Sequence, residues 1–126
     1  MRVALSAHHP LAEKPAFLIE DLSDEPWIDL HGSQAHKQFS GSMLRHAPDW
    51  TRRHAAYRAE DVLFLCQARV GVSLVGQLER LPEDVVARPL VDPMIERSIG
   101  LVEVRGRPLS KVVLAFSRML QAISFA

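Results

Sequence analysis

The stretch Trp27–Leu44, WIDLHGSQAHKQFSGSML, decides the fold, because it has the sequence pattern of a strand, a turn and a helix in that order. Trp27–Leu30 has the composition of a β-strand, and His31–Gln34 is typical of a turn. Ser33 is a suitable N-cap for a helix, because its side chain can accept a hydrogen bond from a free backbone amide. The spacing of the apolar residues that follow places three of them on one helix face: Phe39, Met43 and Leu44. This stretch therefore predicts a strand, a turn and a helix that packs by one face.

The same alternation of strands and helices continues on both sides of this stretch. A second helix is expected to begin at Glu60 and Asp61, whose negative charges suit a helix N-terminus, and to stop at Gly71. The residues expected to face inward from it are Leu63, Phe64 and Cys66. Runs rich in apolar and β-branched residues predict further strands at Arg2–Ala7, Val72–Val75, Val85–Leu90 and Ile99–Val104.

The last helix has the clearest amphipathic pattern in the sequence. Ser110 is its expected N-cap, and the apolar residues that follow form one stripe: Val112, Val113, Phe116, Met119, Leu120 and Ile123. Strands that alternate with helices predict an α/β sandwich lobe, with a mixed or parallel sheet flanked by helices. The 126 residues are enough for one domain with its own core.

The charge balance argues against several classes of partner. Lys plus Arg and Asp plus Glu each number 15, so the net charge is zero and no long-range field attracts DNA or an anionic membrane. We expect no direct DNA binding by this segment and no membrane span, since no window approaches the ~18 apolar residues that a span requires. The run Arg52–His54 beside Trp50 is interpreted as solvated surface charge. The single cysteine, Cys66, excludes an internal disulfide and fits a cytoplasmic protein.

Motifs that carry catalytic or cofactor chemistry are missing from the sequence. It contains no HExxH, paired CxxC, GxGxxG or Walker A motif, and no serine stands in a GxSxG elbow. Six histidines are present, but spacings such as that of His31 and His36 do not place two imidazoles together on a regular helix. We therefore expect no enzyme, no metal site and no cofactor.

Four segments, in this order, resemble the effector-binding domain of LysR-type transcriptional regulators. They are Val3–Leu5 leading into His9–Ala12, then Leu22–Ile28, then Gly71–Val75, then Gly106–Ser110 with the terminal helix. The resemblance extends over nearly the whole chain and rests on the order and spacing of these segments. It implies a periplasmic-binding-protein-like (type 2) fold, in which two α/β lobes joined by crossover strands hold a small effector between them.

By this resemblance, residues 1–126 are the C-terminal part of that domain, truncated relative to the family. The second lobe would extend over about residues 11–91, while residues 1–10 and 99–126 would supply the crossover strands and the terminal helix of the first lobe. The winged helix-turn-helix that binds DNA in the family, and most of the first lobe, have no counterpart in the sequence. The apolar stripe of the last helix would then lack its packing partner, so we expect a homodimer or higher oligomer.

In open α/β sheets ligands bind beyond the ends of strands, so the turns there are the candidate site. The first turn contains Ser6 and His8; the His8 ring could bind a carboxylate or be an inert, exposed histidine. The second contains Gly32, Ser33 and Gln34, at a helix N-terminus whose amides suit a carboxylate or are simply capped.

The third turn contains Val75, Gly76 and Gln77; the family commonly has proline in place of Gly76, so this wall is more flexible here. Arg58 precedes the second helix, and its guanidinium could bind a carboxylate or pair on the surface with Glu60 or Asp61. The expected effector is a small carboxylate or aromatic metabolite. The sequence thus predicts an effector-binding fragment of a LysR-type regulator. The alternative is a stand-alone protein-interaction module that associates with itself or with a full-length regulator.

Overall fold

The computed structural model describes residues 1–51 and 53–124, and it contains both strands and helices in alternation. In chain order the elements are β1 (Arg2–Ser6), β2 (Phe17–Leu18), the 3-10 turn η1 (Ile19–Leu22), β3 (Trp27–Leu30), α1 (Gln34–His46), β4 (Arg53–Ala56), α2 (Ala59–Gln67), β5 (Ser73–Val75), β6 (Val85–Asp92) and α3 (Lys111–Gln121).

The sheet is mixed, as the sequence predicted. Four strands run in the order β2-β6-β1-β5, with β1 antiparallel to both β5 and β6, and β2 parallel to β6. The parallel pair β3-β4 joins this sheet through a bridge between Trp27 and Val72. In that bridge the Ile28 amide donates to the Val72 carbonyl at 2.9 Å, and the Val72 amide donates to the Pro26 carbonyl at 2.8 Å. All six strands therefore belong to one layer.

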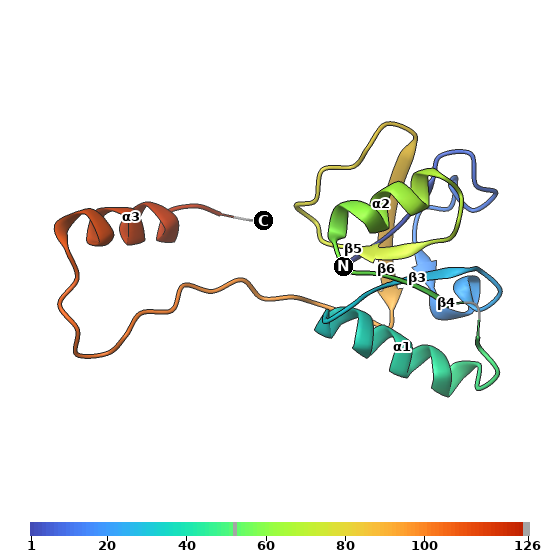
Figure 1. Cartoon of the computed structure of the whole chain (residues 1–126), viewed down its shortest axis with the longest axis horizontal. Coiled ribbons are helices and arrows are strands. Elements are labelled where there is room, and N and C mark those ends of the chain that lie inside the picture. Colours follow the sequence, from blue (N-terminus) through green and yellow to red (C-terminus); the bar gives the residue numbers. More distant parts are fainter. Residues whose placement is uncertain (52, 125–126) are drawn as a thin grey trace.

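Helices α1 and α2 cover opposite faces of this layer (Figure 1). The alternation of side chains along β1 shows why, because successive residues of a strand point to opposite faces. Val3 and Leu5 pack in one apolar cluster with Phe39 of α1, whereas Ala4 packs in a second cluster with Val62 of α2. The two helices therefore enclose two cores, one on each side of the sheet.

Aromatic stacking attaches α1 to the sheet. The ring of Trp27, at the start of β3, stacks on Phe39 of α1 with centroids 3.9 Å apart and an interplanar angle of 12°. Trp50 packs against both rings at the end of the α1 connection. All three side chains are buried, so this contact combines a large apolar area with defined ring geometry.

Two predictions for the helices were wrong in detail. Phe64 was expected to face inward but is 59% exposed, because the inward stripe of α2 runs through Val62, Leu63 and Cys66 and leaves Phe64 on the outer side. Leu44 was expected on the buried face of α1 but is 40% exposed, although Phe39 and Met43 are fully buried as predicted. Each of these residues directly follows a buried one, and the helical step of about 100° carries it past the edge of the buried stripe.

Gly71 does not end α2, which was the role predicted for it. The helix ends at Gln67, and the reversal uses Arg69 in the left-handed region at a φ of 62°. Gly71 instead lies against β3: a Cβ at this position would be 2.4 Å from the Pro26 carbonyl oxygen and 2.9 Å from its carbonyl carbon. The glycine is needed because two backbones approach closely there, next to the bridge that joins β3 to β5.

The predicted strand at residues 99–104 is absent, because no segment among residues 1–51 and 53–124 pairs with it. This segment runs exposed to α3, which lies apart from the sheet and its two helices (Figure 1). The predicted terminal helix does form, and Ser110 caps it by accepting a hydrogen bond from the Val113 amide at 3.3 Å. No helix in the described part of the chain is long and apolar enough to cross a bilayer.

Replacement Gly71→Ala tests the close approach of β3 and β5. The added methyl group would overlap the Pro26 carbonyl, so we expect a loss of roughly 1–3 kcal/mol in the free energy of unfolding. Urea denaturation followed by tryptophan fluorescence measures it, since Trp27 lies at the bridge. Gly100→Ala is the matched control, because no atom lies within 4 Å of a Cβ there. Equal stability of the two variants would contradict the proposed role of Gly71.

Candidate functional site

One end of the sheet gathers most of the predicted site residues, and we call it the open end. Strands β3 and β5 are parallel at their bridge, so both finish at this end. Strand β1 is antiparallel to β5, with Arg2 opposite Val75, so β1 begins there instead. The connection that follows β6 returns to the same end, where Ile95 is anchored by a hydrogen bond from the Met1 ammonium group to its carbonyl at 2.8 Å.

Three adjoining hollows open at this end. The largest, about 580 Å³, lies between the turn after β3, the first turn of α1, the start of α2 and residues 96–98. A second, about 330 Å³, lies between Met1, residues 76–78 and residues 96–99. A narrow hollow of about 30 Å³ shares Ser33 with the first and Gly76 with the second. The three form one continuous concave surface.

Six of the nine predicted residues lie on this surface. Gly32, Ser33 and Gln34 line the largest hollow, and residues 75–77 line the other two. Ser33 also caps α1, since its hydroxyl accepts a hydrogen bond from the His36 amide at 3.4 Å. Ser33 therefore both caps α1 and lines the hollow.

The other three predicted residues lie elsewhere. Ser6 is at the far end of β1, paired with Val85, and its buried hydroxyl accepts a hydrogen bond from the His8 amide at 3.2 Å. The His8 ring lies 3.8 Å from the Asp84 carboxylate. Arg58 lines none of the three hollows and pairs with Glu60 on the surface at 3.6 Å. The structure does not bring these three residues together with the other six.

Arg97 is the residue that sequence reasoning missed. It lines all three hollows, and its guanidinium makes no hydrogen bond or ion pair with any residue in the described part of the chain. Its place depends on Ile95, which is 1% exposed and holds the connection against the core. The apolar pair Met94-Ile95 between Pro93 and Glu96 was the only signal in the sequence, and it does not say where a side chain two positions after Ile95 will lie.

An aromatic pair lines the largest hollow together with this cation. The rings of His31 and Tyr57 have centroids 4.9 Å apart, and Tyr57 is 77% exposed. A flat apolar ligand could stack on such a surface, because offset and tilted ring contacts are favourable. The hollow thus offers a cationic side chain and an aromatic face together.

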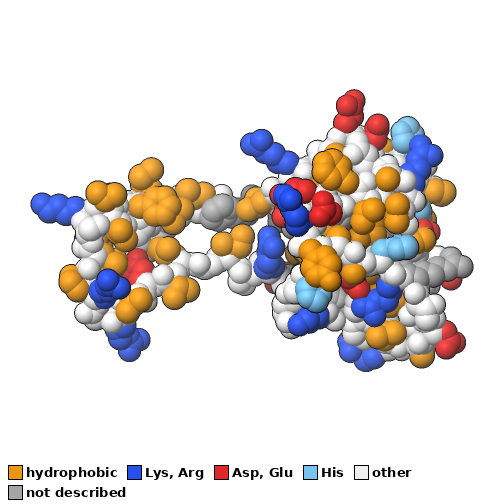
Figure 2. Space-filling model, in the orientation of Figure 1, with side chains coloured by type: hydrophobic (Ala, Val, Ile, Leu, Met, Phe, Trp, Pro, Cys, Tyr) orange, Lys and Arg blue, Asp and Glu red, His pale blue; other side chains and the backbone are white. Residues whose placement is uncertain are grey.

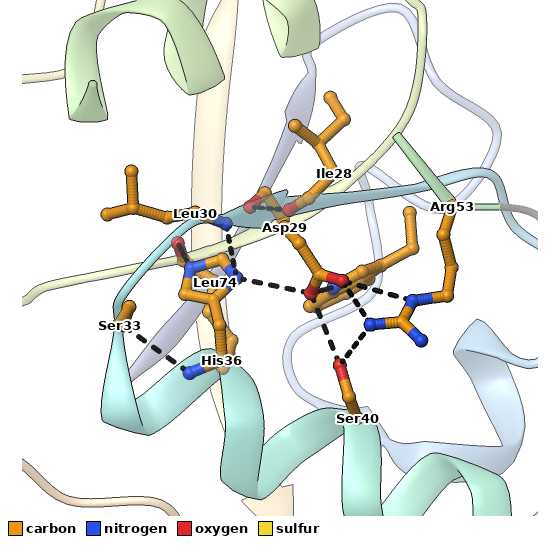
Figure 3. A network of polar contacts seen from close by, with 10 residues as sticks. Ile28, Asp29, Leu30, Ser33, His36, Ser40, Arg53 and Leu74 are labelled. Carbon is orange, nitrogen blue, oxygen red and sulfur yellow. Dashed lines mark hydrogen bonds and ion pairs between the residues drawn. The ribbon is translucent and has the colours of Figure 1, made fainter. Parts of the chain in front are cut away.

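His36 connects the two strands that end at the hollows (Figure 3). The Leu30 amide donates to His36 Nδ1 at 3.1 Å, and the Leu74 carbonyl lies 3.1 Å from Nε2. A backbone amide can only donate and a carbonyl can only accept, so the ring carries its hydrogen on Nε2 and donates it to Leu74. This histidine, whose spacing in the sequence argued against a metal-binding role, holds the ends of β3 and β5 at a fixed separation.

Asp29 is the centre of the adjoining polar network (Figure 3). Its carboxylate accepts hydrogen bonds from Trp27 Nε1 at 2.9 Å, Ser40 Oγ at 3.2 Å and Arg53 Nε at 3.0 Å. Burial alone would raise the pKa of Asp29, but hydrogen bonds from the Arg53 guanidinium and the Trp27 indole lower that pKa from 3.8 to about 2. Arg53, interpreted from the sequence as solvated charge, is instead an ion-pair partner; Arg52 lies outside the described residues.

Arg2 of β1 fixes residues 76–77, which form one wall of the hollows. Arg2 Nη2 donates to the carbonyls of Gly76 and Gln77, each at 3.0 Å. Within residues 1–51 and 53–124, no three His, Cys, Asp or Glu side chains are arranged to hold a metal ion. The open end presents an arginine, free helix amides and aromatic rings, together with the carboxylates of Glu79 and Glu96.

A mixed α/β layer flanked by helices, with a concave surface beyond its strand ends, defines the class of protein: a periplasmic-binding-protein-like (type 2) fold. The chain belongs to the LysR substrate binding domain family, which matches residues 1–123. No curated protein matches it.

Solved structures share this fold at low sequence identity. The BenM effector binding domain with its effector benzoate is 23% identical with a TM-score of 0.61, and the match covers 73% of this chain and 45% of that one. The effector binding domain of QuiR in complex with shikimate is 18% identical with a TM-score of 0.72 over 93% of this chain and 57% of that one. HinK, a LysR family transcriptional regulator from Pseudomonas aeruginosa, is 19% identical with a TM-score of 0.70 over 93% and 42%. The chain thus spans between 42% and 57% of these solved chains.

The Asp29 network predicts a specific acid sensitivity. Because the pKa of this carboxyl is depressed in the folded state, its contribution is complete above the unfolded value near 4 and is lost as pH falls through about 2. The contribution amounts to about 2 kcal/mol. Urea unfolding at a series of pH values should show that Asp29→Asn lowers stability at neutral pH and removes this part of the acid dependence. Glu13→Gln, at an exposed carboxylate, is the control; a wild-type slope in Asp29→Asn would contradict the prediction.

Proposed function

We propose that the chain is the ligand-binding lobe of a LysR-type regulator and holds a small carboxylate or aromatic metabolite at its open end. In this proposal residues 11–91 belong to the second lobe of the domain, and residues 99–126 return to a first lobe that closes over the ligand. The observation that carries the proposal is Arg97, a cation without an ion pair among the described residues that lines every hollow at the open end.

The open end suits a carboxylate on chemical grounds. A guanidinium group presents parallel N–H donors that match the two oxygens of a carboxylate. The first-turn amides of α1, at Gln34 and Ala35, have no partners within the helix and carry the positive end of its dipole toward the largest hollow. His31 and Tyr57 add an aromatic face. Benzoate and shikimate, which BenM and QuiR bind, have this combination of a ring and a carboxylate.

Binding without chemical conversion is the activity we propose. Cys66 is the one cysteine in the sequence and would be its strongest nucleophile. It is fully buried, and its sulfur contacts the Ala4 carbonyl oxygen at 3.6 Å. Burial raises the pKa of its thiol to about 12, so it is a thiol and not a thiolate near neutral pH. In this proposal a ligand changes the closure of the two lobes, and this change alters transcription. Other parts of a regulator make the DNA contacts, and the protein acts in the cytoplasm.

A second candidate function is protein association through the C-terminal segment. We call the sheet with α1 and α2 the body of the molecule. Large apolar side chains are exposed along residues 99–123, and Figure 2 shows them gathered on the part that projects from this body. On α3 they include Val112 at 78%, Phe116 at 58% and Met119 at 68% exposed. Such a continuous apolar surface is unfavourable in water and suits a partner chain. A second copy of this chain, or a full-length relative, would cover it.

Ligand binding is tested by calorimetric titration of the chain with benzoate and with shikimate. Arg97→Gln should weaken binding of the ligand that binds wild type by roughly tenfold or more, because it removes a charge-assisted contact. Arg58→Gln is the matched control, since this arginine lines none of the hollows and should leave affinity unchanged. Absence of binding by wild type, or equal losses in both variants, would contradict the proposal.

Association is tested by light scattering. The wild-type chain should have the mass of a dimer or larger assembly, and the double replacement Phe116→Gln with Met119→Gln should return it to a monomer. Lys111→Gln on the same helix changes a polar exposed side chain and should leave the mass unaltered. A monodisperse wild-type monomer would exclude this second function.

A further inference from the structure

Gly76 and Arg97 are in direct contact at the open end. A Cβ placed on Gly76 would lie 3.0 Å from Arg97 Nη2, 3.8 Å from its Cζ and 3.5 Å from Glu79 Cγ. The guanidinium therefore lies tightly against the position that a side-chain carbon at residue 76 would take. A contact of 3.0 Å is closer than ordinary van der Waals packing, so a larger residue at position 76 would require the guanidinium to shift by a few tenths of an ångström.

Little else constrains the guanidinium itself. Glu79 and Glu96 also line the hollows, yet neither carboxylate forms an ion pair with Arg97 in the described part of the chain. The two backbone segments on either side are, in contrast, held firmly by the start of β1. The Met1 ammonium group bonds to the Ile95 carbonyl, and Arg2 bonds to the carbonyls of Gly76 and Gln77. The backbone on both sides of the Arg97 guanidinium is therefore fixed, and the guanidinium itself is available to bind a ligand.

We infer that Gly76 positions Arg97, and that this pair makes the hollows selective for anionic over neutral effectors. The inference rests on the proposed ligand-binding function and names the side chains that determine the charge class of the ligand. The absence of a Cβ lets the guanidinium lie against the wall at Gly76, and Arg97 lines all three hollows. Arg97 is exposed, and a side chain at position 76 would shift its guanidinium by a few tenths of an ångström away from this wall, which changes the hydrogen-bond geometry that it offers to a carboxylate.

Gly76→Ala separates this positioning role from a structural one. The backbone of Gly76 is outside the left-handed region, and the obstacle to a methyl group is the far end of a flexible side chain. The unfolding midpoint should therefore stay at the wild-type value. Benzoate affinity should fall by roughly three- to tenfold, whereas benzamide, the neutral analogue, should bind wild type and variant equally.

A double-mutant cycle shows whether the glycine acts through the arginine. If it does, Gly76→Ala combined with Arg97→Gln should bind benzoate no more weakly than Arg97→Gln alone. Gly100→Ala, which has no neighbouring atom within 4 Å, is the control and should bind as wild type. Additive losses, or unchanged benzoate affinity in Gly76→Ala while Arg97→Gln binds weakly, would overturn the inference and leave the proposed function standing.

A readout that needs no ligand distinguishes the remaining outcomes. The Nε–Hε resonance of Arg97 in ¹⁵N nuclear magnetic resonance spectra should shift in Gly76→Ala and stay in place in Gly100→Ala. An unmoved resonance would overturn the positioning role. If the resonance moves but wild type binds neither benzoate nor shikimate, the proposed function fails for these ligands, and selectivity by charge fails with it.

Discussion

The fold depends on the close backbone approach of β3 and β5. The bridge between Trp27 and Val72 is possible only because Gly71 has no side chain to meet the Pro26 carbonyl. It joins the β3-β4 pair to the four-stranded sheet and makes all six strands one layer. It also brings the ends of β3 and β5 to the same side, which is where the turns at residues 31–34 and 75–77 meet. The open end is thus a direct consequence of one glycine-dependent contact.

Buried polar groups hold this contact in register. His36 connects the Leu30 amide to the Leu74 carbonyl, and the Ser73 hydroxyl donates to the Ile28 carbonyl. Each of these groups would be costly to bury alone, but paired they specify one alignment of the two strands. Asp29 extends the network to α1 and to β4 through Ser40 and Arg53. These paired groups fix the strand ends beneath the hollows, whereas the Arg97 guanidinium has no hydrogen bond or ion pair within the described residues.

The body and the C-terminal segment have opposite surface chemistry. In the body, apolar side chains fill two clusters on the two faces of the sheet. Along residues 99–123 they are exposed, and α3 carries most of the stripe (Figure 2). The two proposed functions use different parts of the molecule, since the ligand would bind at the open end and a partner would cover α3. They are compatible if the partner surface completes the wall of the hollows near residues 96–99.

The sequence by itself determined the order of the elements, the caps at Ser33 and Ser110, and the buried faces at Phe39 and Met43, because these depend on residues within one or two helical turns. It also located the turns at residues 32–34 and 75–77, which follow strands. Only the tertiary structure decided that Ser6 and His8 lie at the other end, since strand direction in a sheet is set by distant partners. Pairing also decided that residues 99–104 form no strand, because a strand needs a neighbour that the described chain does not supply. Arg97 entered the site through the anchoring of Ile95 by Met1, a contact across 94 residues that no local pattern contains.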